Sequence, residues 1–264
     1  MIKKSVVPVI AAAWMLGFIA PAFSQTAQEL ILKGDEFYSQ FDDQKALEQY
    51  LEALKVDPNH YGALWKTARA YVDLGDLLDP GLKDLKDKQM SFYQNGEDYA
   101  RKAVKANARD TWGFFQLSAA MGKKLLLMSK KEQVQMSKEV RGYIDKAIAL
   151  DPRNDLAHHA LGRWHRRMAE IGGVKRLMGG LLYGGIPKGS FEESEKAMRT
   201  AIDLKPEYGN HRLELGRTLL ALDKHKEAAA EFQACLDAPV ITSKCPLYKK
   251  EAQRELEQVK KKLK

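Results

Sequence analysis

The sequence predicts an all-α protein, a solenoid of about five helix pairs with a C-terminal capping helix. Three observations predict it. Apolar residues recur at three- and four-residue steps through most of the chain. A pattern of small and aromatic residues in residues 27–60 recurs four more times. Short turns separate the helical stretches, and several of these turns contain a proline that ends the preceding helix.

The first helix pair, residues 27–60, sets the pattern for the others. Leu30, Gly34 and Phe37 share one face of its first helix, and Ala46 and Tyr50 share one face of its second. Small residues allow two antiparallel helices to approach closely, and an aromatic ring then fills the space beside the small residue of the other helix. This order of residues over about 34 positions resembles a tetratricopeptide repeat.

The remaining repeats carry inserts of different lengths. The second repeat begins at Tyr61 and has an insert around residues 77–89, and the third begins at Thr111 and is extended before Ile144. The fourth begins at Asp155 and has the longest insert, whereas the fifth, around Gly216, has none. Residues 246–263 then form an amphipathic helix, which we expect to cover the last repeat because each unit buries its apolar face only against a neighbour.

The N-terminus has the layout of a secretory signal. Lys3 and Lys4 precede an apolar run that ends at Ala20, and small residues follow at Ala22 and Ser24. The alternative is an uncleaved membrane anchor, for which the run is short. We therefore expect residues 1–24 to be a signal peptide cut after Ser24, residues 27–264 to be a tetratricopeptide-like domain, and the mature protein to be periplasmic or secreted.

The composition limits the partner classes. The chain is 45% hydrophobic and 30% charged, which is enough to bury a substantial core. Its formal net charge is +8, and much of the excess lies in the last predicted helix, where we expect a solvated face. We expect no nucleic-acid partner, because the chain has an export signal and no recognition motif.

Cys235 and Cys245 are the only two cysteines. An oxidising compartment would permit a disulfide between them, and this bond would tie the end of the fifth repeat to the start of the last helix. The alternative is a pair of inert thiols, because spacing alone does not show that the side chains converge.

The fourth repeat contains the most distinctive motifs of the chain. They are Leu161-Gly162-Arg163-Trp164, Ala169-Glu170 and the entry Pro187-Lys188-Gly189-Ser190 into the next helix. This arrangement resembles the regulator of microtubule dynamics family over residues 147–236, and more weakly over the earlier repeats. The resemblance implies a non-enzymatic repeat domain, and one family member is known to bind and transfer phospholipid through that domain. This chain differs in having a cleavable signal in place of an organelle-targeting or anchor segment.

The insert of the fourth repeat contains three glycine pairs between residues 172 and 185. They bracket short apolar pieces that also carry cations. The pattern is compatible with a lid or membrane-touching loop, but we favour the alternative of a packing insert that folds back on the solenoid.

The first helix of each pair lines the concave side of a tetratricopeptide array, and this rule selects a set of groove residues. The N-terminal half of the groove is predicted to be aromatic and the C-terminal half rich in guanidinium groups. The candidate binding residues are Trp65, Arg69, Trp112, Phe115, His159, Arg163, Arg166 and Arg217.

Two interpretations of these residues remain open. The arginines either pair with acidic residues such as Asp73, Glu170 or Glu214, or bind an anionic ligand. The tryptophans either belong to the core or line a binding surface. We expect no metal, because the adjacent His158 and His159 face apart and no carboxylate completes a ligand set.

The sequence contains no nucleophile elbow, metalloprotease helix or nucleotide-binding loop, so we expect no catalysis and no cofactor. The leading hypothesis is an exported non-enzymatic scaffold that binds a protein or peptide in its concave groove. The alternative is a phospholipid-binding or lipid-transfer protein, with acyl chains on the aromatic residues, the headgroup on the arginines and the insert as a lid.

Overall fold

The computed structural model describes residues 25–171 and 185–263. That part of the chain contains eleven helices and no strand, in agreement with the predicted all-α class. The predicted signal peptide and most of the predicted lid lie outside the described residues. The helices are α1 (Ala27–Ser39), α2 (Asp43–Val56), α3 (Tyr61–Asp76), α4 (Leu85–Ala106), α5 (Thr111–Leu127), α6 (Lys130–Leu150), α7 (Asp155–Ala169), α9 (Phe191–Leu204), α10 (Gly209–Ala221), α11 (His225–Asp237) and α12 (Cys245–Lys262).

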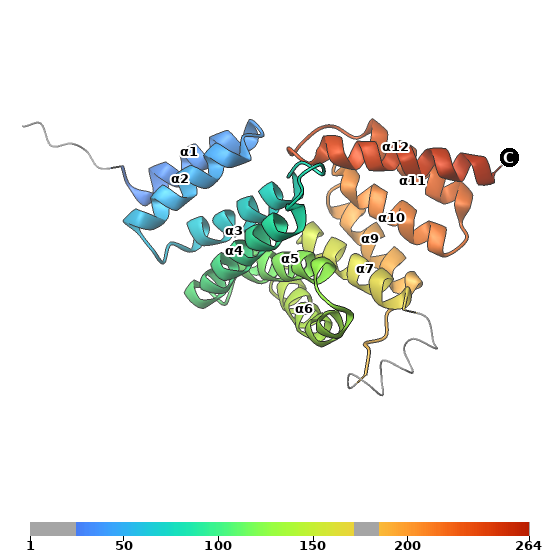
Figure 1. Cartoon of the computed structure of the whole chain (residues 1–264), viewed down its shortest axis with the longest axis horizontal. Coiled ribbons are helices and arrows are strands. Elements are labelled where there is room, and N and C mark those ends of the chain that lie inside the picture. Colours follow the sequence, from blue (N-terminus) through green and yellow to red (C-terminus); the bar gives the residue numbers. More distant parts are fainter. Residues whose placement is uncertain (1–24, 172–184, 264) are drawn as a thin grey trace, which may run out of the picture.

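The helices form five pairs, and consecutive pairs stack side by side into a curved solenoid (Figure 1). The pairs are α1 with α2, α3 with α4, α5 with α6, α7 with α9, and α10 with α11. Two of the second helices are long, α4 with 22 residues and α6 with 21. The extension of the third repeat is therefore largely additional helix, whereas residues 77–84 of the insert in the second repeat form a loop between α3 and α4. The predicted solenoid of five pairs and a capping helix is confirmed.

Close helix crossings repeat the same contact at both ends of the solenoid. A Cβ atom added at Gly34 would lie 2.5 Å from Cε1 of Tyr50, and one added at Gly216 would lie 2.5 Å from Cε1 of Phe232. Both rings are fully buried. Glycine is therefore required at these crossings because an aromatic ring of the partner helix occupies the space of a side chain.

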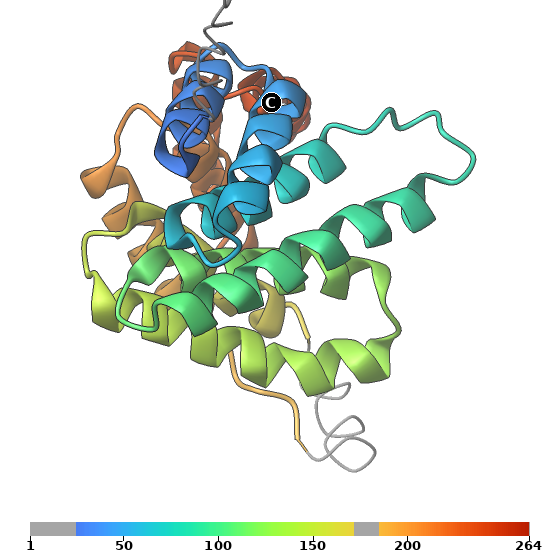
Figure 2. The same cartoon turned by 90° about the vertical axis from the view of Figure 1, so that its left-hand side faces the viewer.

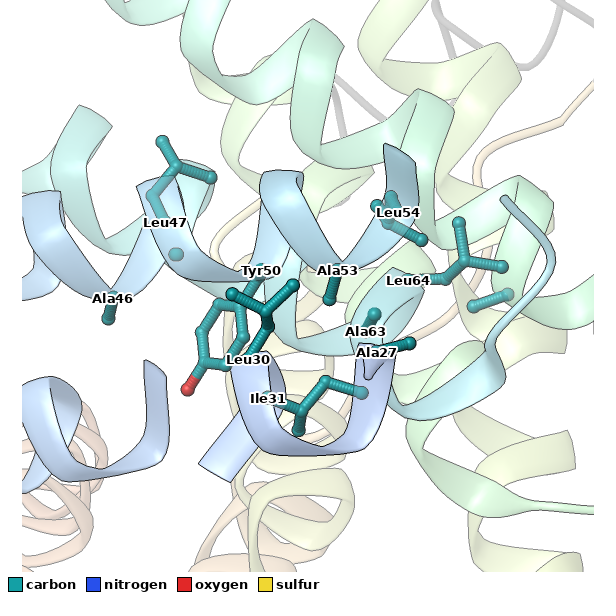
Figure 3. Close-up of a cluster of buried hydrophobic side chains, with 12 residues drawn as sticks. Ala27, Leu30, Ile31, Ala46, Leu47, Tyr50, Ala53, Leu54, Ala63 and Leu64 are labelled. Carbon is teal, nitrogen blue, oxygen red and sulfur yellow. The ribbon is translucent and has the colours of Figure 1, made fainter. Parts of the chain in front are cut away.

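The core of the first repeat continues into the second. Leu30, Ile31, Ala46 and Tyr50 pack together between α1 and α2, and Leu64 of α3 extends the cluster (Figure 3). At the other end, Ala252, Leu256 and Val259 of α12 are buried against the fifth repeat, as expected for a capping helix.

The two ends of the solenoid come close together. The segment between α11 and α12 reaches back to the first two repeats. In both views α1, α2 and α12 lie along the upper side of the molecule (Figure 1 and Figure 2).

Candidate functional site

The concave stripe of the first helices contains two groups of side chains with different chemistry. We call Tyr38, Trp65, Arg69, Trp112 and Phe115 the aromatic cluster; they come from α1, α3 and α5. We call Arg163, Arg166, Glu214 and Arg217 the arginine cluster; they come from α7 and α10. The predicted division between an aromatic and a guanidinium half describes this arrangement, with Glu214 at the centre of the second group.

The aromatic cluster is built on two stacked indoles. The rings of Trp65 and Trp112 lie 5.1 Å apart at an interplanar angle of 18°, and Phe115 contacts Trp112 edge-on at 6.1 Å. Phe115 is buried, whereas both tryptophans are half-buried. The cluster therefore presents aromatic surface to solvent from a stacked pair whose rings hold each other in place.

Arg69 completes the cluster through ring contacts. Its guanidinium carbon lies 3.5 Å from the ring centroid of Tyr38 and 5.2 Å from that of Trp65. One terminal nitrogen, Nη2, donates to the hydroxyl of Tyr50 at 3.3 Å, while Nε is buried without a hydrogen-bond partner among the described residues. This arginine is held by cation–π contacts, and part of its hydrogen-bonding capacity is unused.

The arginine cluster is organised around one buried carboxylate. Glu214 is hydrogen-bonded by Arg166 and, at 2.9 Å, by Nη1 of Arg217, and its Oε1 lies 3.8 Å from Nε of Arg163. Burial alone would raise the pKa of Glu214, but the three guanidinium groups outweigh burial and hold that pKa well below its usual value. Glu214 is thus an ionised, buried partner of these arginines.

Arg166 and Arg217 have further acidic partners. Arg166 donates to Glu170 at 3.1 Å, and Arg217 donates to Glu251 of α12 at 2.8 Å. Burial would lower the pKa of Arg217, but Glu214 and Glu251 raise it above its ordinary value. The geometry of these two arginines is therefore that of internal pairing, the first of the two interpretations left open by the sequence.

A polar cavity of about 270 Å³ lies beside the arginine cluster. Arg163, Glu214 and Arg217 line one side, and Asp76 and Lys123, which form an ion pair at 2.7 Å, line another. Burial lowers the pKa of the Lys123 ammonium group, and Asp76 acts in the opposite direction. Three acidic and three basic side chains line the cavity, so its lining has no excess of positive or negative charge.

His159 lies at the opposite end of α7 from Arg166 and is buried. Its Nδ1 shares a hydrogen bond of 2.9 Å with Nδ1 of His211, and Nε2 of His211 lies 3.0 Å from the Asp155 carboxylate. Because the carboxylate accepts from His211, His159 is the donor in the bond between the two rings. Burial lowers the pKa of both histidines, so both rings are neutral near pH 7.

The two cysteines are buried free thiols that line one small pocket together with Gly209. Burial raises the pKa of the Cys235 thiol to about 11. A disulfide between Cys235 and Cys245 remains a prediction. In the part of the chain that the structure describes, no group of three or more His, Cys, Asp or Glu side chains is arranged to hold a metal ion.

The family described as regulator of microtubule dynamics protein 1-3 matches residues 30–264 of this sequence. The chain belongs to the regulator of microtubule dynamics family. Regulator of microtubule dynamics protein 3 of Mus musculus is 21% identical over 236 residues, which are 88% of this chain and 49% of that protein. Protein 1 of Bos taurus is 25% identical over 219 residues, which are 81% of this chain and 66% of that protein. The chain thus spans about half to two thirds of the length of these relatives.

Solved structures support the repeat fold of this family member. A thermophilic tetratricopeptide repeat protein of Thermus thermophilus superposes with a TM-score of 0.64 at 16% identity, over 87% of this chain and all of that chain. Pseudomonas aeruginosa PilF superposes with a TM-score of 0.52 at 13% identity, over 90% of both chains. Among the described residues, no helix has the length and apolarity needed to span a bilayer.

Sequence reasoning missed one part of the concave side of this family member. Ser243 and Lys244 of the segment before α12 bond to Asp43, Asp73 and Asp76 of the first two repeats. No pattern in the sequence marks this contact, because the residues are separated by more than 160 positions and lie outside the repeat offsets.

Proposed function

We propose that this chain is an exported, non-enzymatic repeat scaffold that binds a segment of a partner protein or peptide at the aromatic cluster. The observation that carries the proposal is the stacked Trp65–Trp112 pair, half-buried on neighbouring helices of the concave side and flanked by Arg69. Tryptophan, tyrosine and arginine are the residues that most often dominate binding at protein interfaces. A preformed stacked pair also loses little conformational freedom when a partner docks.

The arginine cluster is a weaker candidate for the same role. A bound anion at Arg166 or Arg217 would have to compete with Glu214, which is 4% exposed and already hydrogen-bonded to both. Releasing a buried carboxylate from its partners is costly. The phospholipid alternative places the headgroup at these arginines, and no observation favours it over the peptide proposal.

Affinity capture from cells after mild crosslinking tests the binding role. We expect the mature protein to enrich one or a few proteins, and the double variant Trp65→Ala, Trp112→Ala to lose most of that enrichment. Phe92→Ala is the matched control, because Phe92 is a half-buried aromatic residue on α4, away from the aromatic cluster. Circular dichroism establishes that both variants are folded. Equal enrichment by the wild type and the double variant would contradict the proposal.

The export part of the proposal has a separate test. We expect the protein expressed from the full sequence to appear in the periplasmic or extracellular fraction, with Gln25 as its first residue. N-terminal sequencing of the fractionated protein checks this. A cytoplasmic protein that retains Lys3 and Lys4 would overturn the export proposal and leave the binding proposal in place.

A further inference from the structure

The segment between α11 and α12, residues 238–244, crosses from the last repeat to the first two; we call it the strap. Ser243 Oγ donates to the carboxylate of Asp43, at the start of α2. Lys244 Nζ lies 2.6 Å from Oδ1 of Asp73 and 3.2 Å from Oδ2 of Asp76, both on α3. The loop that precedes α12 can be followed back toward α1 and α3 in Figure 1.

These ionic contacts are buried. The side chains of Lys244, Asp73 and Asp76 are 13%, 8% and 7% exposed. Salt screens buried pairs weakly. Asp76 also pairs with Lys123 at 2.7 Å, whereas loss of Lys244 would leave Asp73 with no ion-pair partner among the described residues. The strap is therefore a specific contact and not a loose surface ion pair.

The strap also carries most of the connection between the two ends of the solenoid. Extensive packing between α12 and the helices of the first two repeats is absent from the described part of the chain, whereas α12 packs closely on α10 and α11. Arg217 of α10 also bonds to Glu251 of α12. If Lys244 separates from Asp73 and Asp76, α12 should remain packed on the fifth repeat. The contact that opens then lies between the start of α12 and α3.

This contact borders the polar cavity. Asp76 of α3, which accepts from Lys244, forms one part of the cavity wall, and Leu247, Tyr248 and Glu251 of α12 form another part. Solenoids change curvature through small rotations added over successive repeats. A small relaxation of that curvature would separate these two parts of the wall.

We propose that the strap is a latch that holds the solenoid closed over the polar cavity, and that Lys244 is its fastening residue. When Lys244 leaves Asp73 and Asp76, the first two repeats and the fifth repeat with α12 move apart, and the cavity opens toward solvent. The latch is distinct from the proposed binding at the aromatic cluster and does not depend on it.

Cys245 provides a native probe of the release of the strap, because its Sγ lies 3.3 Å from Oγ1 of Thr242 in the strap. It follows Lys244 directly and is a free thiol, 4% exposed in the closed form. We expect the reduced mature protein to react with a thiol reagent such as DTNB at least tenfold faster in the Lys244→Met variant than in the wild type. A Cys235→Ala background assigns the reaction to Cys245.

Two substitutions serve as controls for the latch. Lys250→Met removes an exposed lysine from α12 and should leave the rate unchanged. Lys244→Arg keeps the charge and should stay within threefold of wild type. The rate in Lys244→Met should be insensitive to low urea, because local opening exposes little new surface. Small-angle scattering should show a larger radius of gyration for Lys244→Met alone.

The proposal fails if Lys244→Met reacts at the wild-type rate. It also fails if its faster reaction follows the urea dependence of global unfolding, since the substitution would then act on overall stability. If Lys244→Met does not fold, Asp73→Asn removes the shorter of the two ion pairs of Lys244, and a rate equal to wild type in that variant overturns the latch.

Discussion

The aromatic cluster and the arginine cluster lie on the same concave stripe but differ in how their arginines are held. Each cluster contains one buried arginine Nε without a hydrogen-bond partner among the described residues, that of Arg69 and that of Arg166. In the aromatic cluster, Trp65 and Trp112 are half-buried, and Arg69 is held by ring contacts with Tyr38 and Trp65. In the arginine cluster, Glu214 bonds to Arg166 and Arg217 and lies 3.8 Å from Arg163. The first region has surface left for a partner, whereas the second resembles a buried ionic joint between repeats. A row of arginines in a groove is thus weak evidence for an anionic ligand until their internal partners are known.

The largest expected effect comes from removing the carboxylate at the centre of the ionic joint. Glu214→Gln should lower the free energy of unfolding by about 3–5 kcal/mol, because it leaves the guanidinium groups of Arg166 and Arg217 without their buried counter-charge. Urea unfolding followed by circular dichroism measures this. Glu257→Gln on the exposed face of α12 is the control and should change stability by less than about 0.5 kcal/mol. A Glu214→Gln variant as stable as the control would contradict the ionic joint.

The two halves of the groove differ in surface chemistry, but their helix pairs share the same close contact between a glycine and an aromatic ring. Substitutions of these glycines test this similarity. Gly34→Ala and Gly216→Ala should each destabilise by about 1–3 kcal/mol, since each new Cβ would overlap a buried ring. Gly142→Ala in α6, where a Cβ meets nothing within 4 Å, should instead stabilise by up to about 1 kcal/mol. Thermal unfolding of the three variants measures whether their stabilities follow this order. Stabilisation of all three variants by similar amounts would show that helix propensity alone decides these sites, and would contradict the close crossings.

Acid should weaken the C-terminal half of the groove more than the N-terminal half. Burial lowers the pKa of His159 and His211 in the folded state, so the unfolded chain binds protons first as the pH falls. Stability should therefore be greatest above the unfolded pKa of about 6.5 and should fall below it, by at most about 1.4 kcal/mol per pH unit for each histidine.

Urea unfolding at pH 7.5 and pH 5.5 measures this dependence. His159→Gln should reduce the loss of stability between pH 7.5 and pH 5.5. His158→Gln, at the adjacent half-buried residue, should leave that loss of stability as it is in the wild type. An equal loss in both variants would show that other groups cause the acid sensitivity.

Local sequence patterns were sufficient for the fold. Gly34 and Tyr50 in the first repeat, and Gly216 and Phe232 in the fifth, occupy equivalent offsets and make the same contact in the structure. These interactions lie within one helix pair, so their spacing appears directly in the sequence. The same spacing placed Trp65 and Trp112 on the concave stripe, where they stack.

The partners of the charged residues could be predicted only in part. Glu214 was a candidate partner of the arginines because it lies on a neighbouring first helix. The bond from Arg217 to Glu251 depends on how α12 packs, and the bonds from Lys244 to Asp73 and Asp76 depend on the accumulated curvature of all five repeats. Curvature is the sum of small rotations between repeats, and no local residue pattern determines that sum.

The most direct test of the account is site-specific photo-crosslinking from the two clusters in the same cells. A photoreactive phenylalanine derivative replaces Trp112 in one variant and Arg163 in another, and both variants are first shown to be folded by circular dichroism. The account predicts a discrete crosslinked protein adduct from position 112 and little or none from position 163. An adduct from position 163, with none from position 112, would contradict it and would place the binding surface at the polar cavity.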